Sequence, residues 1–187
     1  IMIHCINRLC ASMVFSALYF IIIITGLDVV NYAFVIAFGG IFGFLVYNLG
    51  VVGEKRRVFL GDNGSSFLGF FVAWACIYLS SAENNFFNPV TALWLVFIPF
   101  LDCMNVIFQR MRRGKKLFSP DRNHLHHLLM KREINPLTVL SYIFLISLFF
   151  VFIGISLDYF GISASISLLL FLISGSIYLY FTQRLSE

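Results

Sequence analysis

A short polar segment, Leu60-Gly61-Asp62-Asn63-Gly64-Ser65-Ser66, precedes an apolar run and places one carboxylate beside flexible backbone. Its glycines permit tight or left-handed turns, and Ser65 or Ser66 is suited to cap a helix beginning at Phe67. The free N–H groups at a helix start attract phosphate. Asp62 is then placed to hold a hard cation such as Mg²⁺ beside that phosphate. The alternative is an ordinary Asp-Asn-Gly turn in front of a membrane helix.

A second loop carries three of the four histidines within the segment His124-Leu125-His126-His127. Imidazoles bind metals, move protons or donate to phosphate, and the guanidinium of Arg122 is a fork suited to phosphate. If the segment is helical, His124 and His127 share a face and His126 points elsewhere. The spacing matches no common zinc site, and a solvated or lipid-headgroup-facing cluster is the alternative.

One carboxylate, Asp102, lies inside an apolar run, three residues after Pro99. A carboxylate at membrane depth is costly and usually faces a wet cavity or a partner. Asn105 and Gln109 continue the same helix face, so a polar stripe leads toward the histidine loop. The stripe is compatible with a ligand site, with an internal bridge to another helix, or with the broken-helix site of a transporter.

Composition puts these groups in a membrane. The chain is 60% hydrophobic and 12% charged and contains 23 Phe, whereas soluble domains are about 25% charged. A soluble enzyme and a nucleic-acid binder are therefore excluded, and no nucleic-acid partner is expected. A membrane helix needs about 20 apolar residues, which predicts an all-α, polytopic fold of about six spans. The runs are Leu9–Leu27, Val29–Val52, Phe67–Ala82, Thr91–Phe108, Leu137–Leu157 and Ile162–Phe181.

The charges are divided between the two sides of the predicted bundle. All 13 Lys and Arg fall before the first run, in the second-to-third and fourth-to-fifth connections, or after the sixth run. The other connections carry only the acids Asp28, Glu83 and Asp158. Cytoplasmic loops are the basic ones, so both candidate loops are expected on the cytoplasmic side, in one pocket beside the lipid. Residues 1–187 are expected to form a single transmembrane domain, the C-terminal portion of a longer protein.

Three ordered motifs resemble those of the polyprenyl-phosphate N-acetylhexosamine-1-phosphate transferases, in the WecA-like branch. They are Leu60-Gly61-Asp62-Asn63-Gly64-Ser65, Pro99-Phe100-Leu101-Asp102 and Phe118-Ser119-Pro120-Asp121-Arg122-Asn123-His124-Leu125-His126-His127. The resemblance implies transfer of a sugar 1-phosphate, typically GlcNAc-1-phosphate, from a UDP-sugar to undecaprenyl phosphate, with release of UMP. It also implies Mg²⁺, with Mn²⁺ as a substitute. The reaction would start surface polysaccharide synthesis, such as that of O-antigen lipopolysaccharide, at the bacterial inner membrane.

The resemblance also implies roles for individual residues. Asp62 would be a catalytic residue and the Mg²⁺ ligand. The imidazoles of His124, His126 and His127 would act with it on the phosphates of the donor. The residues that it implies for substrate binding are Asn63, Gly64, Asp102, Asp121 and Arg122.

The first residues depart from the family pattern. His4-Cys5-Ile6-Asn7-Arg8-Leu9 stands where the family has DGxDGL, so two acids and two glycines are replaced. This change shifts the local charge by about +3, which repels a cation. We also expect the acidic DDxxD motif of the family to precede this chain. The chain alone is therefore expected to have little or no activity, and a non-catalytic membrane module that binds donor or lipid is the alternative. A homodimer is compatible with the sequence.

Overall fold

The protein is helical throughout the part of the chain that the computed structural model describes. That part comprises residues 2–26, 32–56, 58–112, 114, 124–131 and 135–186, without the side chains of residues 2–8, 54 and 186. No β-strand occurs in these ranges, which confirms the predicted all-α class. The helices are α1 (Met2–Thr25), α2 (Tyr32–Asn48), the short 3₁₀ helix η2 (Glu54–Arg56), α3 (Gly61–Leu79), α4 (Pro89–Leu95), α5 (Phe97–Arg112), α6 (Leu125–Met130), α7 (Pro136–Tyr159) and α8 (Ala164–Ser186).

Within the described residues, fewer helices than the six predicted are long and apolar enough by themselves to cross a membrane. Within the described residues, α7 and the segment Ala164–Leu185 of α8 are each long and apolar enough to cross a membrane. A third crossing is obtained if α4 and α5 are counted together, although they are bent by 78°. The apolar parts of α1 and α2 are shorter, so the prediction of six spans is not confirmed. Large apolar side chains lie exposed along α7 and α8, among them Phe149, Phe152 and Leu172, as expected for a membrane protein.

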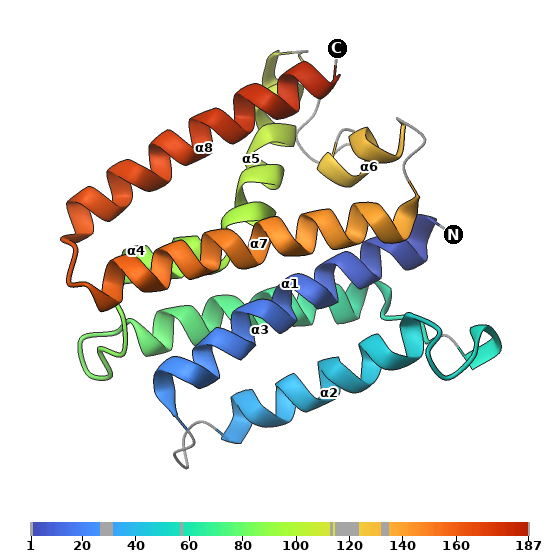
Figure 1. Cartoon of the computed structure of the whole chain (residues 1–187), viewed down its shortest axis with the longest axis horizontal. Coiled ribbons are helices and arrows are strands. Elements are labelled where there is room, and N and C mark those ends of the chain that lie inside the picture. The colour runs from blue at the N-terminus through green and yellow to red at the C-terminus, as the bar shows by residue number, and fades with distance from the viewer. Residues whose placement is uncertain are drawn as a thin grey trace.

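Successive long helices run in alternating directions, so the same end of the bundle collects widely separated segments (Figure 1). The start of α1, the end of α2, the start of α3, helix α6 and the start of α7 all lie at this end, on the right in Figure 1. The connections from α3 to α4 and from α7 to α8 lie at the other end. Helix α1 packs against α2, α3 and α7. The two candidate loops are therefore on the same side, as the charge pattern predicts.

The bend between α4 and α5 is fixed by packing around Trp94. Helix α4 begins at Pro89 and is capped by Asn88, whose side chain accepts a hydrogen bond from the Val90 N–H. Trp94 is buried, and its indole N–H donates to Ser167 Oγ on α8 over 3.1 Å. Its side chain lies directly on Gly154 of α7, where a Cβ atom would come within 2.2 Å of the Trp94 Cβ. The fourth apolar run is thus divided into two helices that α7 and α8 hold at a fixed angle.

Candidate active site at the basic end of the bundle

The segment around Asp62 is the first turn of α3 and not a turn in front of it. The helix begins at Gly61, which has a φ of +71°, six residues before the predicted start at Phe67. The prediction that Ser65 caps the helix was wrong, because its hydroxyl donates to the backbone carbonyl of Asp62 over 3.0 Å. The first turn has no side-chain cap. Its backbone N–H groups and the exposed side chains of Asp62 and Asn63 therefore share one helix end.

The loop before this turn is held by Asn48, a residue that the sequence analysis did not identify. Asn48 is the last residue of α2 and is fully buried. Its side-chain amide donates to the Val58 carbonyl over 2.7 Å, which closes the loop that carries η2. In the sequence, Asn48 is an amide near the end of an apolar run. An ordinary helix end has the same pattern, so the sequence did not indicate this contact.

The three imidazoles of the second loop form a cluster. The ring centres of His126 and His127 are 4.1 Å apart, and those of His124 and His126 are 5.8 Å apart. The prediction that His126 points away from the other two was wrong. It assumed a continuous helix, whereas His124 has an extended backbone (φ −65°, ψ 150°) at the N-cap position of α6. Asp121 and Arg122 lie outside the described residues, so their predicted roles stay predictions.

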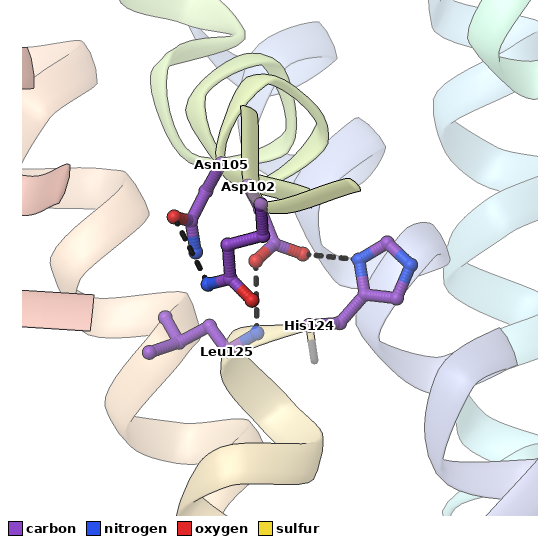
Figure 2. A network of polar contacts seen from close by, with 5 residues as sticks. Asp102, Asn105, His124 and Leu125 are labelled. Atoms are coloured by element: carbon purple, nitrogen blue, oxygen red, sulfur yellow. Dashed lines mark hydrogen bonds and ion pairs between the residues drawn. The ribbon is translucent and has the colours of Figure 1, made fainter. Parts of the chain in front are cut away.

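Asp102 joins this cluster to α5 (Figure 2). One carboxylate oxygen, Oδ2, lies 2.8 Å from Nδ1 of His124, and the other, Oδ1, accepts the Leu125 N–H over 2.8 Å. The internal bridge anticipated as one alternative for Asp102 is therefore present. The hydroxyl of Tyr178 on α8 faces the same carboxylate. Tyrosine in an apolar run gave no signal of this in the sequence.

The polar stripe below Asp102 is present as predicted. Asn105 is fully buried and Gln109 almost fully. The Gln109 side-chain N–H donates to Oδ1 of Asn105 over 3.3 Å. The bond pairs one polar atom of each amide, whereas Nδ2 of Asn105 and Oε1 of Gln109 are buried without a hydrogen-bond partner among the described residues. Unpaired buried amide atoms are costly, so the stripe places two unsatisfied polar groups next to the histidines.

His126 is held in the neutral form. The residue is 5% exposed, and neither ring nitrogen has a hydrogen-bond partner among the described residues. Burial lowers the pKa of His126 to about 4, and the neighbouring His127 and His124 add to the effect, whereas the Asp102 carboxylate opposes it. At neutral pH the ring therefore carries one N–H donor and one acceptor nitrogen. Both are available to a ligand that enters the cluster.

The chain is similar to known proteins over part of its length. Residues 2–80 match the model of glycosyl transferase family 4. The undecaprenyl-phosphate alpha-N-acetylglucosaminyl 1-phosphate transferase of Salmonella typhi is 33% identical over 142 residues, which are 75% of this chain and 39% of that protein. The protein of the same name from Escherichia coli K12 is 34% identical over the same shares. Over residues 2–80 the chain is similar to glycosyl transferase family 4. It spans about two fifths of the length of these relatives. No solved structure matches it.

Asp62 supplies the one carboxylate in the first turn of α3. Its carboxylate makes no hydrogen bond to another described residue. Within the described ranges, no three His, Cys, Asp or Glu side chains are grouped so as to hold a metal ion. Mg²⁺ is commonly bound by one or two carboxylates together with waters and substrate phosphates. Asp62 therefore fits as a single protein ligand in a site that a phosphate-bearing substrate would complete.

Two apolar clefts open on the sides of the helical bundle. The first, of about 450 Å³, lies between α1, α3, α4 and the start of α5, and Met13, Val72 and Pro99 are among its lining residues. The second, of about 570 Å³, lies between α2 and α3 and extends to Leu60 and Phe67, next to the turn that carries Asp62. Both are lined almost entirely by apolar side chains, which suits hydrocarbon and excludes a polar ligand.

Proposed function

We propose that this chain contributes the phosphate-handling part of an enzyme that transfers GlcNAc-1-phosphate from a UDP-sugar to undecaprenyl phosphate and releases UMP. The observation that carries the proposal is the convergence of His124, His126 and His127 on Asp102, at the same end of the bundle as the start of α3. The names of the relatives describe this transfer for those proteins. The product would start surface polysaccharide synthesis, including that of O-antigen lipopolysaccharide.

The donor diphosphate is proposed to lie between the two cytoplasmic segments. The uncapped first turn of α3 offers backbone N–H groups to phosphate, and the neutral ring of His126 offers a further N–H. Asn63 and Gly64 lie in the same turn as Asp62. A Mg²⁺ ion bound through Asp62, or Mn²⁺ in its place, would neutralise charge on the phosphates. The residues of this chain bind and orient the donor, with Asp121 and Arg122 proposed as additional phosphate contacts.

The lipid acceptor is proposed to use the apolar clefts. A polyprenyl chain is hydrocarbon, so it can pass from the lipid into a cleft lined by apolar side chains without burying a polar group, and packing contacts then hold it there. The cleft between α2 and α3 reaches Leu60 and Phe67, which lie on either side of Asp62 in the sequence. A tail there would leave its phosphate headgroup beside the first turn of α3.

The site is proposed to face the cytoplasm at the bacterial inner membrane. Among the described side chains, the Lys and Arg residues lie at helix ends. Some follow α2 and α6, and the others lie in the last turns of α5 and α8. They are Lys55, Arg56, Arg110, Arg112, Lys131 and Arg184. Glu83 and Asp158 lie in or next to the connections at the other end. Basic loops stay on the cytoplasmic side, where nucleotide sugars are made.

The test is a chimera with the relative from Escherichia coli K12. The relative keeps its own sequence up to the residue before the position aligned with Leu9. From that position on, the chimera consists of residues 9–187 of this chain. We expect UMP release and labelled lipid from UDP-[¹⁴C]GlcNAc, undecaprenyl phosphate and Mg²⁺, and we expect Asp62→Asn or His126→Ala to abolish both. This chain alone is expected to give little transfer. A folded chimera that neither binds the donor nor transfers the sugar would contradict the proposal.

One observation favours a second candidate, a membrane module that binds the donor without turnover. The described residues contain no group of three metal-ligating side chains, and residues 4–8 lack the acids of the family pattern. The same assay separates the two functions. A chimera that binds UDP-GlcNAc but releases no UMP, beside an active parent enzyme, would favour the binding module.

A further inference from the structure

A single carboxylate holds two different groups at the start of α6. Oδ1 of Asp102 accepts the backbone N–H of Leu125, and Oδ2 lies 2.8 Å from Nδ1 of His124. The two contacts connect α5 to a segment 22 and 23 residues further along the chain. The contact with the Leu125 N–H fixes the N-terminal end of α6, and the contact with Nδ1 fixes the imidazole ring of His124. The orientation of His124 therefore depends on a residue that lies on another helix.

The contact with Oδ2 also determines where the proton of His124 resides. An ionised carboxylate only accepts hydrogen bonds, so Nδ1 must carry the proton. The hydrogen bond that one ring nitrogen makes sets the state of the other, so in the neutral ring Nε2 is the acceptor. Figure 2 shows Nε2 of His124 on the side of the ring that points away from Asp102. The side chain of His124 is 36% exposed and that of Asp102 is 15% exposed, so the ring is open to a ligand while its anchor is shielded.

His124 in turn is stacked on the rest of the cluster. Its ring lies 5.8 Å from that of His126, with an angle of 17° between the ring planes, and 6.5 Å from that of His127. The charged or titratable groups that face this cluster from the neighbouring helices are Asp102 on α5 and Tyr178 on α8. A change in the orientation of His124 would therefore be transmitted to the buried ring of His126.

We propose that Asp102 is a positioning residue: through Nδ1 of His124 and the Leu125 N–H, it fixes the ring orientation and tautomer with which the histidine cluster meets the donor phosphates. The role in donor binding rests on the proposed function, whereas the control of the tautomer does not. Asp102 itself contacts neither donor nor metal in this account. It acts through His124.

The first arm of the test measures the tautomer directly in the full chain, ¹⁵N-labelled at histidine, in detergent. In Asp102→Asn the amide keeps an oxygen for the Leu125 N–H but presents an N–H₂ group to His124. We expect His124 to change from the Nδ1–H to the Nε2–H form in this variant. The matched control is Asp158→Asn, since Asp158 also accepts a backbone N–H, that of Asn88 over 3.2 Å, at the other end of the bundle. An unchanged tautomer in Asp102→Asn would overturn the proposal.

The second arm measures binding of UDP-GlcNAc with MgCl₂ in a double-mutant cycle. We expect Asp102→Asn to weaken binding by about tenfold, as the loss of one charge-assisted hydrogen bond would. Asp102→Glu should restore part of it, and in the background of His124→Ala the same change should have little further effect. A full additional loss in the His124→Ala background would show that Asp102 does not act through His124. If the unmodified chain binds no UDP-GlcNAc, the proposed donor site fails, and the tautomer arm alone then decides the role of Asp102.

Discussion

The imidazole rings of His126 and His127 lie 4.1 Å apart, centre to centre, and both side chains are buried. Two rings this close inside a protein cannot both be protonated without strong repulsion. His126, whose pKa burial lowers to about 4, is therefore neutral at neutral pH and gives the cluster one donor and one acceptor nitrogen. This property makes it suited to binding a phosphate that an Arg or a metal ion neutralises.

The stability of the protein should fall in mild acid because of His126. Its pKa is about 4 in the folded protein and 6.5 ordinarily. Between these values the unfolded chain binds a proton that the folded chain does not, so stability is full above pH 6.5 and decreases as the pH falls toward 4. The contribution is on the order of 3 kcal/mol at most.

Thermal unfolding in detergent at pH 7.5 and pH 5 checks this pH dependence. The variant His126→Gln cannot take up the proton, so its melting temperature should fall less between the two pH values than that of the unmodified protein. An equal fall in both proteins would show that His126 is not the responsible group.

The contact between Trp94 and Gly154 should tolerate no added methyl group. In Gly154→Ala the new Cβ would meet the Trp94 side chain at 2.2 Å, so α4 and α7 must move apart. Such overpacking costs about 1–3 kcal/mol. The control is Gly39→Ala on α2, where a Cβ meets nothing within 4 Å and alanine favours the helix. Melting temperatures should fall for the first variant and not for the second, and equal values would contradict the packing described for the bend.

The hydrogen bond from Asn48 to Val58 should stabilise the loop before α3. In Asn48→Ala the Val58 carbonyl loses the hydrogen bond from the Asn48 amide, and the loss of such a bond costs about 0.5–1.5 kcal/mol. The control is Ser141→Ala, because that exposed hydroxyl only adds a bond within α7. Limited proteolysis should cut the loop between α2 and α3 faster in Asn48→Ala than in the unmodified protein, and should not cut it faster in Ser141→Ala. Unchanged cleavage would mean that the loop is held by other contacts.

Asp62→Asn should remove Mg²⁺-dependent donor binding without affecting the fold. The side chain is exposed and makes no contact that stabilises the helix. The free energy of unfolding should therefore change by no more than about 0.5 kcal/mol, which thermal unfolding checks. Glu83→Gln, at the opposite end, is the control for charge. Retained Mg²⁺-dependent binding in Asp62→Asn would exclude this carboxylate as the metal ligand.

Much of the fold was predictable from composition, because apolar runs of this length form helices in any membrane protein. The charge pattern likewise predicted which connections share an end of the bundle. The break at Val96 was not predictable. Thr91–Phe108 is apolar apart from Thr91, Asp102 and Asn105, none of which lies at the break. The bend arises from the packing of Trp94 on Gly154, two residues that are far apart in the sequence.

The candidate site likewise has features that the sequence predicted and features that it did not. The residue types of Asp62, His124 and Asp102 indicated phosphate chemistry, and the polar stripe below Asp102 followed from helical spacing. The clustering of His126 with the other two rings could not be predicted from helical spacing, because it depends on α6 beginning at Leu125. Asn48 and Tyr178 were missed, since the tertiary contacts through which they contribute leave no local pattern in the sequence.

The central claim is that the first turn of α3 and the histidine cluster belong to one donor site. The direct measurement is paramagnetic broadening of the histidine ring signals by Mn²⁺ bound together with UDP-GlcNAc, with Mg²⁺ as the diamagnetic reference. The account predicts that the signals of His124, His126 and His127 broaden in the unmodified chain and stay sharp in Asp62→Asn. Sharp signals from all three rings at saturating Mn²⁺ and donor would contradict it.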